Sequence, residues 1–281
     1  MSYRNNEDRV AAPPSDNPTP HMAVQESGFS FATPTEFVEL PSGGTFYPEG
    51  HPLHNEGTVE IKYMTAKDED ILTSPSLLKK GLAVDRLVKN ILVDKNIDPG
   101  SLLVGDKNAI LIAARITGYG ESYAASVTCP VCAMTGIHEF DLSQMRTYVP
   151  DFDELGVSPT GNGEYSLQLP KCGVEVTFRA LTGRDEKNLL MIGERKKKQN
   201  LPETTLTDQF RATIAAVNGN REQNYINQFI DVMPAMDSRL LRSTYAKTIP
   251  NVNMGQTYTC ESCGSEEEVT MPFTAEFFWP K

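Results

Sequence analysis

Two pairs of cysteines, each in a Cys-x-x-Cys arrangement, constrain this sequence more than any other feature. The first pair is Cys129 and Cys132, the second is Cys260 and Cys263, and 127 residues lie between them. Zinc prefers four thiolate or imidazole ligands in a tetrahedron, and a tight Cys-x-x-Cys turn brings two thiolates toward one point. Each pair lies between β-like segments, which is typical of a zinc ribbon. The sequence therefore predicts one structural zinc ion held by all four thiolates.

Two other interpretations of these cysteines stay open. Redox-active pairs are disfavoured because neither pair stands at a strand-to-helix junction, where a thiol pKa is lowered. Unmetallated core cysteines are the second alternative. A catalytic zinc is disfavoured because four thiolates leave no open coordination position. The segment Met1 to Asn6 lacks the basic flank and apolar core of a secretory signal. We therefore expect a reducing compartment, where this pattern indicates a metal rather than disulfides.

The composition narrows the possible functions. The chain has 281 residues, enough for one large or two ordinary domains, and a net charge of −11. An acidic surface repels phosphate backbones, which argues against a general nucleic-acid binder. The strongest basic run, Arg195 to Lys198, is interpreted as the solvated end of a helix rather than a binding patch. No apolar run approaches the roughly 18 residues of a membrane span.

The expected fold class is α+β, with a mixed helical core and a split four-cysteine zinc ribbon formed by two β-hairpin knuckles. The long separation of the knuckles implies that the chain between them leaves the ribbon and returns to it. Five regions are predicted: a proline-rich tail at 1–30 that is disordered or ordered by a partner, an N-terminal α+β region at 31–121, the first knuckle and hairpins at 122–180, a helical insertion at 181–250, and the second knuckle with an aromatic C-terminus at 251–281.

Local patterns predict the individual elements. Alternation indicates strands at 37–40, 45–47, 59–63, 125–128, 136–140, 165–169, 174–178, 257–259 and 267–271, with a loop at 150–163. Helical spacing and capping residues indicate helices at 67–72 after Thr65, from Asp98, at 107–117 after Asp106, from Thr182, through Phe210 to Val217, at 225–232 and at 235–248. The aromatic residues from Phe273 to Trp279 are expected to be buried in an interface with a partner.

Other candidate residues have plainer interpretations. His138 is predicted to be an ordinary strand residue, since the thiolate set is already complete, and Cys172 a free thiol in a hairpin turn. His51 and His54 are interpreted as solvated loop residues rather than metal ligands. The acids at 68–70 fit the first turn of a helix better than an acid/base pair. A phosphate-binding glycine loop and a Ser/His/Asp elbow are both absent, so we expect no enzyme.

The order of several motifs is distinctive. Leu-Pro-Ser-Gly-Gly-Thr-Phe-Tyr-Pro at 40–48 is followed by Asp-Ile-Leu at 70–72, Lys-Lys-Gly at 79–81, Gly-Asp-Lys-Asn-Ala-Ile-Leu at 105–111, Ala-Arg-Ile-Thr-Gly-Tyr-Gly at 114–120, the Cys129 knuckle, and Phe-Phe-Trp-Pro at 277–280. This series resembles the T4-type phage baseplate hub assembly proteins. The resemblance extends over 37–281 and is clearest at 37–140.

The resemblance implies a component or assembly factor of the baseplate hub of a contractile-tailed phage, acting through contacts with other hub and tail proteins. It also implies synthesis in the host bacterial cytoplasm, and it leaves open whether the protein stays in the virion. The alternative from the cysteine pattern is a zinc-ribbon nucleic-acid or transcription accessory protein, which would need a basic face. A zinc hydrolase is a third and weaker interpretation.

Overall fold

In a computed structural model of the chain, the structure describes residues 33–278 apart from 80, 149, 273 and 274. The chain divides into two units, Met1–Ala32 and Thr33–Lys281, and every described element belongs to the second. The proline-rich tail predicted for 1–30 therefore lies outside the described residues. Within the described part, no helix is both long and apolar enough to span a bilayer.

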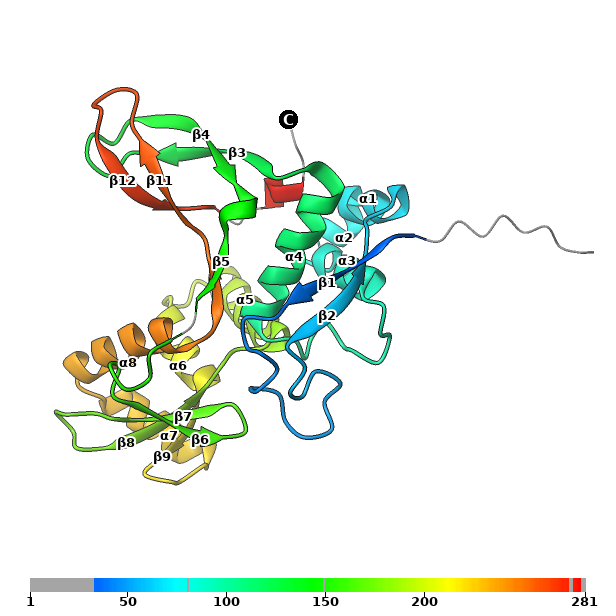
Figure 1. Cartoon of the computed structure of the whole chain (residues 1–281). Coiled ribbons are helices and arrows are strands. Elements are labelled where there is room, and N and C mark those ends of the chain that lie inside the picture. Colours follow the sequence, from blue (N-terminus) through cyan, green and yellow to red (C-terminus); the bar gives the residue numbers. More distant parts are fainter. Residues whose placement is uncertain (1–32, 80, 149, 273–274, 279–281) are drawn as a thin grey trace, which may run out of the picture. The chain divides into compact units, whose positions relative to one another are not determined.

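The elements of the second unit confirm the expected α+β class (Figure 1). The α-helices are α1 (Ala66–Thr73), α2 (Pro75–Lys79), α3 (Ala83–Ile91), α4 (Val104–Tyr119), α5 (Gly183–Lys198), α6 (Thr205–Thr213), α7 (Gln223–Val232) and α8 (Ala235–Thr248). The strands are β1 (Thr35–Glu39), β2 (Thr58–Lys62), β3 (Ser122–Thr128), β4 (Thr135–Asp141), β5 (Arg146–Tyr148), β6 (Val157–Gly161), β7 (Glu164–Gln168), β8 (Glu175–Arg179), β9 (Ile214–Val217), β10 (Asn251–Asn253), β11 (Gly255–Thr259) and β12 (Glu266–Thr270). Short 3₁₀ helices follow β4 and precede the C-terminus, at Leu142–Gln144 and Ala275–Phe278.

The larger hydrophobic core is built around α4. This helix is apolar on most faces and buries residues all around its circumference, as its sequence predicts for a central helix. The hairpin β1–β2, the helices α1 and α3, and the hairpins β3–β4 and β11–β12 contribute further core side chains. Gly120 ends α4 with a φ of 84°, a conformation that glycine adopts without strain.

A second, smaller core lies within the chain between the two cysteine pairs. Strands β6, β7, β8 and β9 form an antiparallel sheet in that order, and residues of α6, α7 and α8 pack with it. The hairpin predicted at 165–178 is confirmed as β7 and β8.

Two predictions in this region were wrong. The expected loop at 150–163 contains β6, where Pro159 is tolerated because β6 is an edge strand. The expected helix through Phe210 to Val217 ends at Thr213, and Ile214–Val217 instead pairs with β8 as β9. A run of four apolar residues is compatible with either state, and pairing with the sheet decided it.

The excursion between the cysteine pairs leaves and returns along one two-stranded ladder. Strand β5 carries the chain away from the first hairpin, and β10 brings it back to the second. The two strands are antiparallel partners, with Tyr148 opposite Asn251 and Arg146 opposite Asn253. The cysteine spacing predicts that the inserted segment leaves the ribbon and returns to it. The pairing of β5 with β10 shows this return in the backbone.

The N-terminal region differs from the prediction at three points. The segment at 45–47 is not a strand, and β1 pairs with β2 across the longer loop instead. Asp98 begins a turn and not a helix, because Ser101 donates its N–H to the Asp98 carbonyl (2.9 Å) and the helix starts only at Val104. Asp106 is not the cap of α4, since it lies inside the first turn and accepts hydrogen bonds from distant residues.

The aromatic C-terminus is buried within the chain itself. Phe277 and Phe278 belong to the larger core, and the Nε of the fully buried Arg115 donates to the Phe277 carbonyl (2.9 Å). For these two residues the predicted burial against a partner was wrong, because α4 and β3 already provide the apolar surface. Phe273 and Trp279 lie outside the described residues.

Candidate metal centre

The two cysteine pairs are held by hairpins of the same local design. In β3–β4 the ladder ends at Thr128 opposite Thr135, and in β11–β12 it ends at Thr259 opposite Glu266. Strand β3 alternates buried and exposed residues throughout, and β11 does so over its last three residues, which places Val127 and Tyr258 in the core. Figure 1 shows the two hairpins next to each other.

Backbone hydrogen bonds fix each knuckle in the same way. The Cys129 N–H donates to the Met134 carbonyl (2.8 Å), and the Cys260 N–H donates to the Ser265 carbonyl (2.9 Å). The residue directly after the second cysteine has a left-handed backbone in both, with φ of 58° at Ala133 and 70° at Gly264. This turn aims both thiols of a pair to the same side.

The four cysteine sulfurs meet in one cluster. Their Sγ atoms all lie within 4.8 Å of one another, although the two pairs are 127 residues apart along the chain. The contacts cross between the hairpins, since Cys129 Sγ lies 3.8 Å from Cys263 Sγ and Cys132 Sγ lies 3.7 Å from Cys260 Sγ. All four are free thiols, so the cluster could bind a metal ion.

Local dipoles favour the ionised form of two of these thiols. The backbone N–H of Cys132 and then the Ser265 hydroxyl lower the pKa of Cys129. The backbone N–H groups of Cys263 and Ser262 lower the pKa of Cys260 in the same manner. Thiolates are the metal-binding form of cysteine, so the first residue of each knuckle is prepared to act as a ligand.

The close approach of the four sulfurs instead disfavours the ionised form of Cys132. The N–H of Met134 lowers its pKa, but burial and the neighbouring sulfurs outweigh this and leave the pKa raised. Several thiolates within a few ångströms repel one another, and a bound cation removes that penalty. The cluster therefore has the electrostatic character of a site for a positive ion.

His138 lies beside the cluster and outside it. It stands on β4 as predicted, and its ring meets the rings of Phe140 and Tyr258 edge to face at 4.7 and 5.4 Å. Cys172, also as predicted, lies in the turn between β7 and β8 as a free thiol, where its N–H donates to the Asp237 carboxylate (2.8 Å). Neither belongs to the group of side chains that could hold a metal.

The two loop histidines lie in a loop as expected, but they are half buried and hydrogen-bonded. His51 accepts the Leu53 N–H on Nδ1 (3.1 Å), which leaves Nε2 to donate to Ser101 Oγ (2.8 Å). His54 Nδ1 contacts the Tyr47 carbonyl at 2.6 Å. Burial lowers the pKa of His51, in keeping with a neutral ring.

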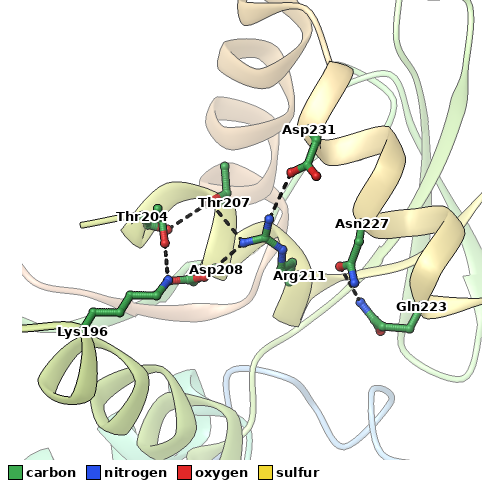
Figure 2. A network of polar contacts seen from close by, with 8 residues as sticks. All are labelled: Lys196, Thr204, Thr207, Asp208, Arg211, Gln223, Asn227 and Asp231. Atoms are coloured by element: carbon green, nitrogen blue, oxygen red, sulfur yellow. Dashed lines mark hydrogen bonds and ion pairs between the residues drawn. The ribbon is translucent and has the colours of Figure 1, made fainter. Parts of the chain in front are cut away.

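The acids and bases singled out in the sequence serve helix ends. Asp68 completes a capping box with Thr65 at the start of α1. The basic run 195–198 ends α5 as predicted, but Lys196 is half buried and not freely solvated. Figure 2 shows Lys196 with Asp208 of α6, and the two charged groups are 2.5 Å apart. Arg211 continues this network from Asp208 (3.2 Å) to Asp231 of α7 (3.1 Å).

A buried polar cluster that sequence reasoning missed joins two separate motifs. The Asp106 carboxylate accepts the Ser42 N–H (2.9 Å), the Ser42 hydroxyl (2.6 Å) and the Tyr47 hydroxyl (2.7 Å). The Leu103 N–H in turn donates to the Tyr47 hydroxyl (3.1 Å). Ser42 and Tyr47 belong to the motif at 40–48, and Asp106 to the motif at 105–111. The only signal in the sequence was that both motifs occur in the same family resemblance.

Comparison with known proteins gave one match. The family described as T4 bacteriophage base plate protein matches residues 33–158, just under half of the chain. This stretch includes the first cysteine knuckle and both motifs joined by Asp106. Searches of curated proteins and of solved structures found no match. The resemblance to T4-type phage baseplate proteins is confirmed over this stretch. The hub-assembly role, and the resemblance beyond residue 158, stay predictions. Over residues 33–158 the chain is similar to this family, and the match supports a T4-type phage baseplate protein.

Proposed function

We propose that this protein is a non-enzymatic component or assembly factor of the baseplate hub, stiffened by one structural zinc ion. The ion would be held by Cys129, Cys132, Cys260 and Cys263. The observation that supports the zinc is the spacing of the sulfurs. Zn–S bonds of about 2.3 Å in a tetrahedron put ligand sulfurs roughly 3.8 Å apart. The two shortest contacts between the hairpins are 3.7 and 3.8 Å.

The donor set argues for a structural role of this ion. Four thiolates close the coordination shell, so no position remains for a water or a substrate. The two hairpins would then form a split zinc ribbon, in which the metal joins the end of the family-matched region to the end of the chain. Such a clamp stabilises a scaffold and supplies no reaction chemistry.

The hub role rests on the baseplate family and on the absence of catalytic motifs in the sequence. Baseplate proteins act in contact with other phage proteins, and we infer that the partners here are other hub and tail proteins. Assembly would take place in the host bacterial cytoplasm, with the protein either released or retained in the virion tail.

Zinc content is the first test. Native mass spectrometry of the purified chain should find one zinc ion per chain, and Cys260→Ser should abolish it. Cys172→Ser is the matched control, because that thiol lies outside the cluster, and it should keep the metal. If Cys260→Ser proves insoluble, the exposed Cys263→Ser tests the same shell. A metal-free wild-type chain, or disulfides between the pairs, would contradict the proposed site.

The assembly role is tested separately in infected cells. A phage lacking this gene should accumulate heads and incomplete tails, and a plasmid copy should restore tail assembly. The Cys172→Ser copy should restore assembly fully, and the Cys129→Ser copy poorly. Normal tails in the deletion phage would refute the hub role whatever the zinc content.

A further inference from the structure

Helix α5 presents an outward face that is not covered by the rest of the described chain. The helix is 16 residues long, and Gly183 at its start is its only buried residue. Leu189 and Ile192 are half buried, on the side where α5 packs against α6 and α4. Further around the helix, Leu190 is 67% exposed at the edge of the groove between α5, α6 and α8, and Met191 is 52% exposed.

These two apolar residues stand in the middle of a charged stripe. Residues three and four apart share one face of a helix, so Lys187 and Glu194 flank Leu190 and Met191 on the same side. The next residue along the stripe is Lys198, whose Nζ lies 3.9 Å from the Glu194 carboxylate with both side chains largely exposed. A loose pair of this kind is readily exchanged for another partner.

The stripe is complementary to itself when reversed. A two-fold axis between positions 190 and 191 would set Leu190 against Met191 of a second copy. The same axis sets Lys187 of each copy against Glu194 of the other copy, so the pairing contains two such ion pairs. A closed symmetric dimer requires this kind of self-complementary patch, in which residue i contacts j and j contacts i.

We propose that α5 is a self-association surface, at which two copies of this chain pair through antiparallel α5 helices. Charge complementarity favours this occupant over an unrelated protein. Lys187 and Glu194 carry this argument, since they have opposite charges and stand at equal distances from the axis. Antiparallel packing also aligns the helix dipoles favourably.

The contact area of this pairing is small, so the dimer is expected to be weak. A helix of this length spans about 24 Å at 1.5 Å per residue. One such contact, with two apolar residues per copy, covers less than the roughly 800 Å² per partner of a standard interface. The dissociation constant is therefore expected between about 1 µM and 1 mM, a range relevant where several copies are brought together.

Sedimentation velocity of the full chain over that concentration range, at fixed physiological salt, measures the association directly. The wild-type chain should shift from monomer to dimer, and Leu190→Lys should keep it monomeric. Val232→Ser is the matched control, because Val232 is a more exposed apolar residue (77%) on α7 and should leave the equilibrium unchanged. A wild-type chain that stays monomeric to the highest concentration would overturn the proposal.

A charge-exchange cycle tests the geometry of the pair. Lys187→Glu alone and Glu194→Lys alone each place like charges opposite one another twice, and each should weaken dimerisation about tenfold. The double variant restores opposite charges and should recover most of the affinity. Thermal denaturation should show that all three variants stay folded, since both side chains are on the surface. Antiparallel pairing would be refuted if the single variants dimerised with the wild-type dissociation constant. It would also be refuted if the double variant dimerised no more tightly than the single variants.

Discussion

At the scale of single residues, the Asp106 carboxylate is a buried polar link between two distant segments of the larger core. It is fully buried, and burial raises its pKa even though the hydrogen bonds from Ser42 and Tyr47 oppose that shift. Burial and the nearby Asp106 likewise raise the pKa of Tyr47, so its hydroxyl remains a donor at any ordinary pH. The cluster holds the loop at 40–48 against the first turn of α4.

Asp106→Ala is expected to lower the free energy of unfolding by about 2–4 kcal/mol, because it leaves three buried donors without an acceptor. Urea unfolding followed by circular dichroism measures the loss. Asp70→Ala is the control, since Asp70 is an exposed acid on α1 and its removal should change stability by less than about 0.5 kcal/mol. Equal losses in the two variants would show that the cluster contributes nothing specific.

The same residue shows why single positions were harder to predict than patterns. An aspartate before an apolar helix is a reasonable cap by local rules, and Asp106 was interpreted so. Its true partners, Ser42 and Tyr47, are 64 and 59 residues away in the chain. No local rule contains that information.

At the scale of elements, α4 and β10 approach unusually closely. A Cβ atom added to Gly105 would overlap the Pro250 carbonyl oxygen, and that backbone cannot move without shifting the β5–β10 ladder. Gly105 therefore permits the contact by which the excursion packs against the central helix.

Gly105→Ala is expected to destabilise the protein by about 2 kcal/mol or more, as an overpacked contact with rigid backbone does. Gly193→Ala on α5 is the matched control. A Cβ at Gly193 meets nothing within 4 Å, so alanine should stabilise its helix by up to about 1 kcal/mol. Thermal or urea unfolding of the two variants should therefore shift in opposite directions. A shift in the same direction would argue against the close approach.

The two mispredicted elements of the four-stranded sheet share a physical cause. β6 holds a proline and β9 is only four residues long, and both lie at the outer positions of their sheet. Edge strands receive hydrogen bonds from one side only, so their sequences carry weaker strand signals. The well-predicted strands β7 and β8 lie in the interior of that sheet and alternate more clearly.

At the scale of the whole molecule, the proposed metal would stabilise one part of the chain and not the other. The hairpins β3–β4 and β11–β12 are both two-stranded, and such hairpins are marginal by themselves. The sheet β6–β9 forms a separate hydrophobic core with α6, α7 and α8. None of the four clustered cysteines belongs to that core.

Metal removal by a chelator should therefore act locally. In hydrogen-exchange mass spectrometry, amides of β3, β4, β11 and β12 should exchange at least about tenfold faster after chelation, while those of β7 and β8 keep their rates. Readdition of zinc should reverse the change. Uniform acceleration across both parts, or no change in the hairpins, would refute a clamp confined to the ribbon.

The sequence by itself determined the local units and their chemistry: the α+β class, the central apolar helix α4, two matching cysteine hairpins, and a family resemblance that holds over 33–158. These depend on periodicity, turn residues and ligand spacing, which are properties of short stretches. Only the tertiary structure decided which distant stretches meet. The cysteine pairs converge across 127 residues, β5 pairs with β10, and Asp106 joins two motifs. Such contacts are selected by the packing of the whole core, where each partner is chosen from every buried surface at once.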